Sequence, residues 1–195
     1  MDHTNTSIKR EPFALIYADP PWSIQQHGQR GASRKYDLMT TEDIKRMPIA
    51  DLAADDAVLA LWTTSAALPD ALEVMRSWSF EYKSTAIWDK YYMGLGHYFR
   101  GSHELLLLGV KGKPMVKFHG QLSVFREPRL EHSRKPQEIV QKLERMFDGP
   151  YLELFARERP NSLANWSVWG NEIDADITIP GYPVPSDFVQ RNPRS

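Results

Sequence analysis

The chain of 195 residues contains no cysteine, which excludes disulfide bonds, thiolate zinc sites and cysteine nucleophiles. No apolar stretch approaches the roughly 18 residues of a membrane span, and no signal-peptide pattern opens the sequence. We therefore expect a cytoplasmic protein with no membrane partner. A formal net charge of only -1 means that any nucleic-acid binding depends on local basic patches. The sequence also lacks Gly-x-Gly-x-x-Gly, which argues against an ordinary dinucleotide-binding fold.

The composition is that of an ordinary globular protein, with 42% hydrophobic and 25% charged residues. This length predicts a single domain over 1–195, with 1–12 and about 174–195 as peripheral, loosely attached tails. Apolar runs and helical periodicity alternate along the rest of the chain, which predicts a three-layer α/β sheet. The expected strands are 13–18, 57–62, 85–88, 104–110, 122–125, 151–155 and 166–169. The expected helices start near Thr40, at a Ser65 cap and at Pro136.

The most informative residues are Asp19-Pro20-Pro21-Trp22, which follow the first predicted strand. Open α/β sheets place their ligands at the carboxyl ends of strands. Proline nitrogens cannot donate, so these prolines offer only carbonyl acceptors, beside one carboxylate and one stacking indole. Such a set suits a planar group that bears an exocyclic NH2, such as adenine. The alternative is a rigid turn after a strand.

Three further groups carry candidate binding residues. Lys135 precedes a helix start, where it can neutralise a carboxylate, and Glu153 ends the next strand, where it can bind ribose hydroxyls. Asn171 and Glu172 follow the last strand and a glycine, in position to meet a base edge or a ribose. The structural alternatives are a capped helix with a Glu153–Arg157 pair and a turn that closes the sheet.

Two segments have the composition of nucleic-acid contacts. The polar segment 23–35 predicts a mobile loop that contains Arg30, Arg34 and Lys35. Aromatic residues in 89–101 are interleaved with Lys90 and Arg100, a pattern that stacks bases and contacts phosphates. A packed loop or a homodimer contact explains the same aromatics, so a homodimer is a possibility that stays open. Histidines 97 and 103 are too isolated for a metal site, and no metal is expected.

Taken together, these residues resemble the MT-A family of adenine-N6 methyltransferases over about 13–173. The similarity lies in Asp-Pro-Pro-Trp at 19–22, Tyr36 to Met39, 57–62, 96–112, Arg134-Lys135-Pro136, 153–157 and 166–172. It implies a Rossmann-like fold that uses S-adenosylmethionine, with the permuted motif order of β-type DNA amino-methyltransferases. Here the catalytic tetrapeptide precedes the cofactor-binding half.

The resemblance also implies a role for each matching residue. The catalytic set is Asp19, Pro20, Pro21 and Trp22, with Asp19 touching both the cofactor ammonium and the target amine. Trp22 and Tyr36 flank the base. The basic and aromatic composition of the two loops, rather than the resemblance, makes Arg30, Arg34, Lys35, Lys90, Tyr91 and Arg100 the candidates to contact the nucleic acid. Lys135 meets the cofactor carboxylate, and the ribose and adenine pocket is lined by Glu153, Arg157, Asn161, Asn171 and Glu172.

Three departures from the family pattern stand out. The stretch Glu158-Arg159-Pro160-Asn161 is longer than the Pro-His-Asn segment of the mRNA enzyme, and Glu172 replaces a glutamine. The segment before the first strand is short and lacks the acidic residue that contacts the cofactor adenine in that family. The sequence predicts an adenine-N6 methyltransferase that acts on DNA, in a bacterial or phage-infected cell. RNA as the substrate, or a non-catalytic nucleic-acid-binding partner, are the alternatives.

Overall fold

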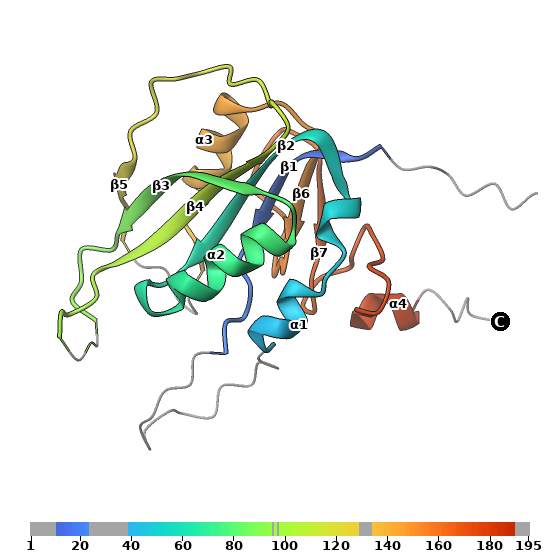
Figure 1. The fold of residues 1–195 in the computed structure, drawn as a ribbon, viewed down its shortest axis with the longest axis horizontal. Coiled ribbons are helices and arrows are strands. Elements are labelled where there is room, and N and C mark those ends of the chain that lie inside the picture. Colours follow the sequence, from blue (N-terminus) through green and yellow to red (C-terminus); the bar gives the residue numbers. More distant parts are fainter. Residues whose placement is uncertain (1–10, 24–38, 95, 97, 129–133, 190–195) are drawn as a thin grey trace, which may run out of the picture.

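The computed structural model describes residues 11–23, 39–94, 96, 98–128 and 134–189, and shows a seven-stranded mixed sheet (Figure 1). The strand order is β5-β3-β4-β2-β1-β6-β7. Every neighbouring pair is parallel except those that involve β4, which runs antiparallel to both β2 and β3. The strands are β1 Phe13–Ala18, β2 Ala53–Thr63, β3 Glu81–Asp89, β4 His103–Lys111, β5 Val124–Arg126, β6 Tyr151–Leu154 and β7 Trp166–Trp169.

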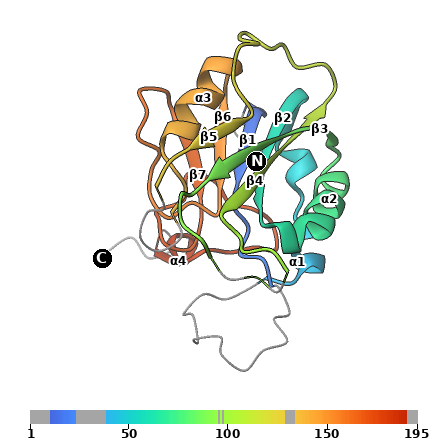
Figure 2. The ribbon, with the colours of Figure 1, turned by 90° about the vertical axis from the view of Figure 1, so that its left-hand side faces the viewer.

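Helices cover both faces of the sheet, as Figure 2 shows with α3 on one side and α1 and α2 on the other. Helices α1 (Thr41–Lys45) and α2 (Leu68–Ser77) pack Ile44 and Met75 against one face. Helix α3 (Glu138–Met146) buries Ile139 and Leu143 against the other. Because side chains alternate across β1, Ile16 belongs to the first cluster and Leu15 to the second. The predicted three-layer α/β architecture is confirmed.

The sheet has a point at β1 where the connections change faces. The chain leaves β1 through α1 toward β2, whereas it reaches β6 on the other side of β1 through α3. Ligands of open α/β sheets bind at such points, beyond the carboxyl ends of the strands. The antiparallel β4 begins where β2 and β3 end, so its first residues join the same edge.

Two helix starts differ from the sequence-based expectation. The cap before α2 is Thr64, whose hydroxyl oxygen accepts from the amide of Ala67 in the short 3-10 turn Ser65–Ala67. Helix α3 starts at Glu138, and the carbonyl of Pro136 only closes a preceding turn by accepting from Ile139 at 3.3 Å. Threonine and serine hydroxyls can both cap a helix, and Thr64 does so here because its extended backbone places its hydroxyl next to the Ala67 amide.

The segment from 174 onward was expected to be a loosely attached tail, and the structure shows that much of it packs. Ile177, Ile179 and Val184 are buried in the same cluster as α1 and α2, and α4 (Pro185–Val189) follows. The hydroxyl of Tyr182 donates to the carbonyl of Asp43 at 2.8 Å. These apolar residues are separated by prolines and polar residues, so they form no periodic pattern that would have predicted burial.

Gly170 lets two segments beside the candidate site approach each other. A Cβ at this position would lie 2.0 Å from the carbonyl oxygen of Ala156, whose amide donates to the carbonyl of Trp169. We expect Gly170→Ala to lower the free energy of unfolding by about 1–3 kcal/mol, because backbone must move to admit the methyl group. Urea denaturation measures this, and an unchanged midpoint would show that the two segments separate without cost.

Candidate active site

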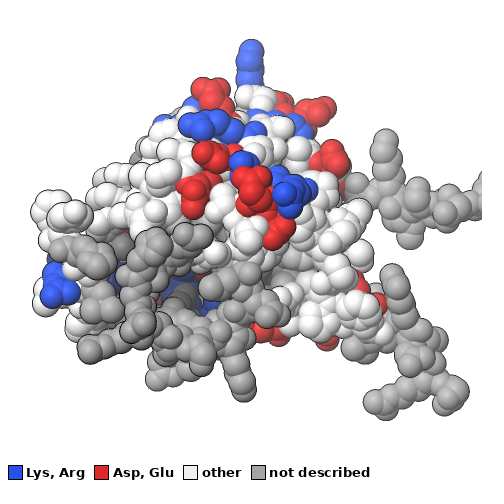
Figure 3. Space-filling model, turned by 60° about the horizontal axis from the view of Figure 1, so that its bottom comes forward, with Lys and Arg blue, Asp and Glu red and all other residues white. Residues whose placement is uncertain are grey.

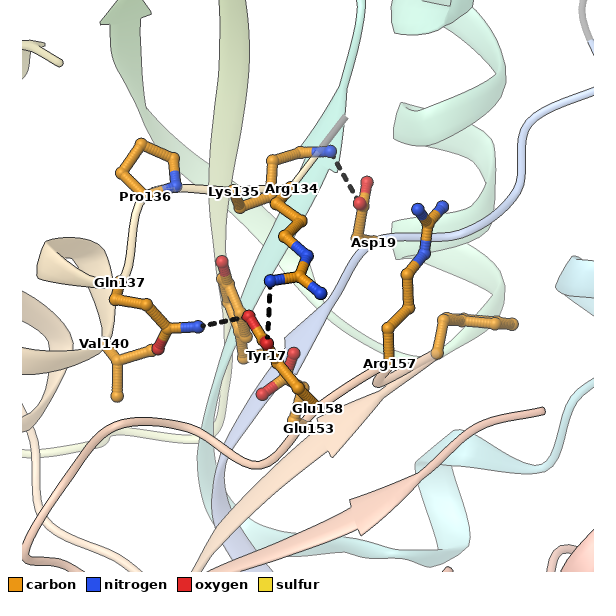
Figure 4. A pocket seen from close by; sticks show the side chains of 11 residues that line it. Tyr17, Asp19, Arg134, Lys135, Pro136, Gln137, Val140, Glu153, Arg157 and Glu158 are labelled. Carbon is orange, nitrogen blue, oxygen red and sulfur yellow. Dashed lines mark hydrogen bonds and ion pairs between the residues drawn. The ribbon is translucent and has the colours of Figure 1, made fainter. Parts of the chain in front are cut away.

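Asp19 lies at the carboxyl end of β1 and forms an ion pair with Lys135, 116 residues later in the chain. The Lys135 Nζ to Asp19 Oδ2 distance is 2.5 Å, and the two side chains are 13% and 29% exposed (Figure 4). Lys135 lies just before α3, whose start faces the same sheet edge. The structure therefore brings the predicted catalytic carboxylate and the predicted anion-binding lysine into direct contact.

Glu104, at the start of β4, completes this charged cluster and was missed by sequence reasoning. Its carboxylate lies 3.4 Å from the Nζ of Lys135 and also pairs with Lys90. Negative and positive groups thus alternate from Asp19 through Lys135 and Glu104 to Lys90. The only signal in the sequence was an acidic residue at the start of an otherwise apolar strand.

Burial and ion pairing shift the pKa values of Lys135 and Glu104 in opposite directions, and the effect of ion pairing is the larger. Burial alone would lower the pKa of Lys135, but the charges of Asp19 and Glu104 raise it above its usual value. Burial would raise the pKa of Glu104, but Lys135 and Lys90 lower it. Both side chains are therefore charged across the physiological range.

Hydrogen bonds fix the tetrapeptide after Asp19. The carbonyl of Pro20 accepts from the amide of Trp22 at 2.8 Å, and the carbonyl of Pro21 accepts from Met39 at 3.3 Å. Both prolines were expected to aim free carbonyls into the site, but each carbonyl already has one donor and keeps one lone pair. The indole of Trp22 donates to the carbonyl of Trp62 at 2.9 Å, which holds its ring in one orientation.

Buried aromatic side chains pack against the Asp19–Lys135 ion pair on its interior side. Trp62 is fully buried and donates its indole N–H to the hydroxyl of Tyr17 at 2.7 Å. The ammonium of Lys135 lies 5.5 Å from the centre of the Trp62 ring, within range of a cation–π interaction. Both residues sit inside apolar strands, so only the tertiary structure identifies them as part of the site.

A pocket opens beside the Asp19–Lys135 pair. It is lined by Tyr17, Asp19, Arg134, Lys135, Pro136, Gln137, Val140, Glu153, Phe155, Arg157 and Glu158 (Figure 4). Arg134 pairs with Glu158 at 3.1 Å, and the amide of Gln137 donates to the same carboxylate at 3.2 Å. Phe155 has a φ of 62°, which is rare for a side-chain-bearing residue and commonly marks a functional site.

Of four further predicted cofactor residues, one lines this pocket and three do not. Arg157 lines it and its Nε is 3.7 Å from the carboxylate of Glu172. Asn161, Asn171 and Glu172 are exposed and are not among the described residues that line the pocket. In this structure the sheet edge therefore brings together Asp19, Lys135, Glu153 and Arg157, but not the two asparagines.

Glu153 has the most perturbed carboxyl group of the site. Burial, followed by the negative charges of Asp19 and Glu158, raises its pKa to about 8. The folded protein therefore keeps this proton between the unfolded pKa of about 4.3 and about 8, where the unfolded chain has lost it. Stability must fall as pH rises through this window.

We expect Glu153→Gln to remove this loss of stability, because glutamine has no proton to release. The melting temperature of the variant should lie close to that of the wild type near pH 5. Toward pH 8 it should exceed that of the wild type by an increasing amount. Thermal unfolding at several pH values measures the difference. A constant difference between the two proteins at all pH values would contradict the raised pKa.

The segment between β3 and β4 is an exposed, largely aromatic surface. Tyr98 and Phe99 are 97% and 92% exposed, and Arg100 is exposed beside them. Figure 3 shows this end of the molecule, at the left of the view, as mostly uncharged surface. Tyr91 is exposed under the guanidinium of Arg126, whereas Lys90 turns inward to Glu104. Lys90 thus belongs to the charged cluster in this structure.

Four predicted substrate-binding residues lie outside the described part of the chain, namely Arg30, Arg34, Lys35 and Tyr36. In the described residues, no group of three His, Cys, Asp or Glu side chains is placed to hold a metal ion. No helix within the described ranges is long and apolar enough to cross a membrane.

The fold and the site define an α/β protein with a pocket lined by acidic and basic side chains. This pocket lies beside β1, where the connections of the sheet change faces. The MT-A70 family model matches residues 13–172, and the chain belongs to that family. It is 30% identical to the type II methyltransferase M.MunI of a Mycoplasma species, over 92% of this chain and 86% of the relative. The predicted family is therefore confirmed, and the protein is of the methyltransferase class.

Other relatives are longer. The chain is 32% identical to the human N(6)-adenosine-methyltransferase catalytic subunit METTL3, over 93% of this chain but only 31% of that protein. It is 30% identical to an MT-A70-like N(6)-adenosine-methyltransferase of Arabidopsis thaliana, over 83% of this chain and 24% of the relative. The chain thus spans less than a third of these two relatives.

Proposed function

We propose that this protein transfers a methyl group from S-adenosylmethionine to the N6 amine of adenine in DNA. The observation that carries the proposal is Asp19 of the Asp-Pro-Pro-Trp sequence, held by Lys135 at the mouth of a polar pocket. DNA is favoured because the relative matched over most of its own length is a type II methyltransferase. RNA is the second candidate, because METTL3 is named an N(6)-adenosine methyltransferase.

The donor set of the pocket fits S-adenosylmethionine. Asp19 supplies a carboxylate for an ammonium, Lys135 supplies an ammonium for a carboxylate, and Glu153 and Gln137 offer partners for ribose hydroxyls. When bound, the cofactor supplies an electrophilic methyl group on a sulfonium. Arg157, Asn161, Asn171 and Glu172 would complete the adenosine pocket, and the asparagines and Glu172 must turn inward to do so.

The chemical difficulty lies in the acceptor, because the lone pair of the adenine amine is delocalised into the ring. Asp19 and the remaining lone pair of the Pro20 carbonyl would accept the two amine hydrogens and favour a pyramidal nitrogen. Lys135 would hold the Asp19 carboxylate in its orientation. Positioning of this kind can supply about 7–11 kcal/mol of the barrier reduction.

The target base would lie between Trp22 and Tyr36, with phosphates near Arg30, Arg34, Lys35, Tyr91 and Arg100. The ammonium of Lys90 is paired with Glu104 and is therefore left out of this set. If the substrate is duplex DNA, the adenine must leave the stack at a cost of a few kcal/mol. The exposed aromatic surface of 91–100 offers stacking partners for the opened strand. A homodimer through the same surface and a cytoplasmic location stay predictions.

We expect Trp22→Ala to weaken both substrate binding and turnover by about 1–3 kcal/mol, through loss of a stacking face. Trp22→Phe keeps a face but loses the hydrogen bond to Trp62, so it should retain most of the binding. Steady-state kinetics with an adenine-containing oligonucleotide measure both variants. Kinetics that match the wild type in Trp22→Ala would remove this residue from the base pocket.

Mass spectrometry of nucleosides tests the proposed function directly. Matched DNA and RNA oligonucleotides are incubated with the protein and S-adenosylmethionine, then digested and analysed. We expect N6-methyladenine in the DNA, and methylation of RNA alone would replace DNA by the second candidate. Without product in either, calorimetry with S-adenosylmethionine decides whether the chain is instead a non-catalytic nucleic-acid-binding partner.

A further inference from the structure

Among the described residues that line the pocket beside Asp19, one carboxyl group has no cationic partner. Glu158 is paired with Arg134, and Asp19 is paired with Lys135. The carboxyl group of Glu153 makes no hydrogen bond or ion pair with any described residue, although it lines the same pocket. In Figure 4 its carboxyl group lies near that of Glu158, and no dashed line reaches it.

The groups that surround Glu153 come from four elements. On β1, Tyr17 is its partner in the sheet register and Asp19 lies two residues further on. On β7 its register partner is the apolar Val168, and the turn after β6 contributes Glu158. The segment before α3 contributes Arg134 and Lys135, which form ion pairs with Glu158 and Asp19 respectively. Arg157 follows on its own segment and pairs with Glu172 at 3.7 Å.

We infer that Glu153 determines the preference for cationic S-adenosylmethionine over neutral S-adenosylhomocysteine, because it loses a proton to solvent when the sulfonium ligand binds. This inference rests on the proposed function of the same pocket. Glu153 is a specificity-determining residue here and takes no part in methyl transfer itself.

The physical reason is the balance of charge in a partly desolvated pocket. Before a ligand binds, burial opposes ionisation of Glu153, as do the negative charges of Asp19 and Glu158, and its pKa of about 8 keeps it protonated near pH 7. A sulfonium brings a positive charge into the pocket, which stabilises the carboxylate and releases the proton. After transfer the sulfur is a neutral thioether, so Glu153 regains a proton and the carboxylate no longer favours the ligand.

Titration calorimetry measures the released protons. Each ligand is titrated near pH 7 in buffers of different ionisation enthalpy, where the α-amino group of the ligand, with a pKa of about 8, stays mostly protonated. We expect the wild type to release about one proton per bound S-adenosylmethionine and distinctly less with S-adenosylhomocysteine. Glu153→Gln should release almost none with either ligand.

The same titrations give the ratio of the two dissociation constants. We expect Glu153→Gln to lower the preference for S-adenosylmethionine by about tenfold, which corresponds to ~1.4 kcal/mol. The matched control is Glu81→Gln, which changes an exposed carboxylate paired with Lys83 outside the pocket and should retain the proton release.

The wild type alone provides a second readout should Glu153→Gln fail to fold. Its preference for S-adenosylmethionine should increase from about pH 6.5 to about pH 8, because less work is then needed to deprotonate Glu153. Equal proton release with both ligands, or a preference that is flat with pH, overturns the inference while the proposed function stands. If the wild type binds neither ligand, the proposed function and this inference both fail.

Discussion

Asp19→Ala is expected to reduce methyl transfer at least about a hundredfold, in the range of 10²–10³ that loss of one preorganised hydrogen-bonding partner costs. The variant lacks the acceptor for one amine hydrogen and the negative charge for the cofactor ammonium. Asp19→Asn is the sharper version, because it keeps the size and one acceptor but removes the charge. Transfer of a labelled methyl group to an adenine-containing oligonucleotide measures both.

The fold should survive this change. Lys135 keeps Glu104 as a partner at 3.4 Å, so the lysine is not left as an unpaired charge. The matched control is Asp55→Ala, an exposed aspartate near the start of β2, away from the strand ends that form the site. Near-normal activity of Asp19→Ala, with the same melting temperature as this control, would refute the assigned role of Asp19.

Lys135→Met is expected to have the largest effect on stability of any change at the site. Methionine replaces most of the buried stem but leaves Asp19 and Glu104 without the ammonium between them, and only Lys90 still compensates. Breaking a buried pair costs about 3–5 kcal/mol, and partial exposure reduces this to about 2–3 kcal/mol here. Urea denaturation measures the loss, and calorimetry should show greatly weakened cofactor binding.

The pH dependence of this loss follows from the two shifted groups. The pKa of Lys135 is raised, so its contribution is present below about 10.4 and disappears as pH rises through the folded value. The pKa of Glu104 is lowered, so its contribution is present above about 4.3 and disappears as pH falls through the folded value. The difference between wild type and variant should therefore be largest at neutral pH.

Lys45→Met is the matched control for this prediction. Lys45 pairs with Glu42 and Glu73 on the surface, where water screens the charges. We expect little change in its unfolding midpoint. If Lys135→Met behaved like Lys45→Met in both stability and cofactor binding, the ion-pair cluster would have no role in the site.

Local sequence signals predicted most elements because each depends on neighbours in the chain. The apolar run 13–18 became β1 with its predicted bounds, and Thr40 caps α1 by accepting from Asp43. Strand β2 extends to Ala53 beyond the predicted run, because Ala53 pairs with Phe13 of β1 although two aspartates interrupt the apolar pattern. The buried segment around Ile177 gave no such signal, because its burial comes from contacts with distant helices.

What the sequence by itself determined is the chemistry available at one place: a carboxylate, two prolines and an indole directly after a buried strand. Only the tertiary structure decided which groups meet it. Glu104 reaches Lys135 because β4 runs antiparallel and starts where the parallel strands end, and Trp62 lies beneath because β2 neighbours β1. Residue types and spacing record local preferences, whereas these contacts join residues many positions apart and depend on the strand order of the whole sheet.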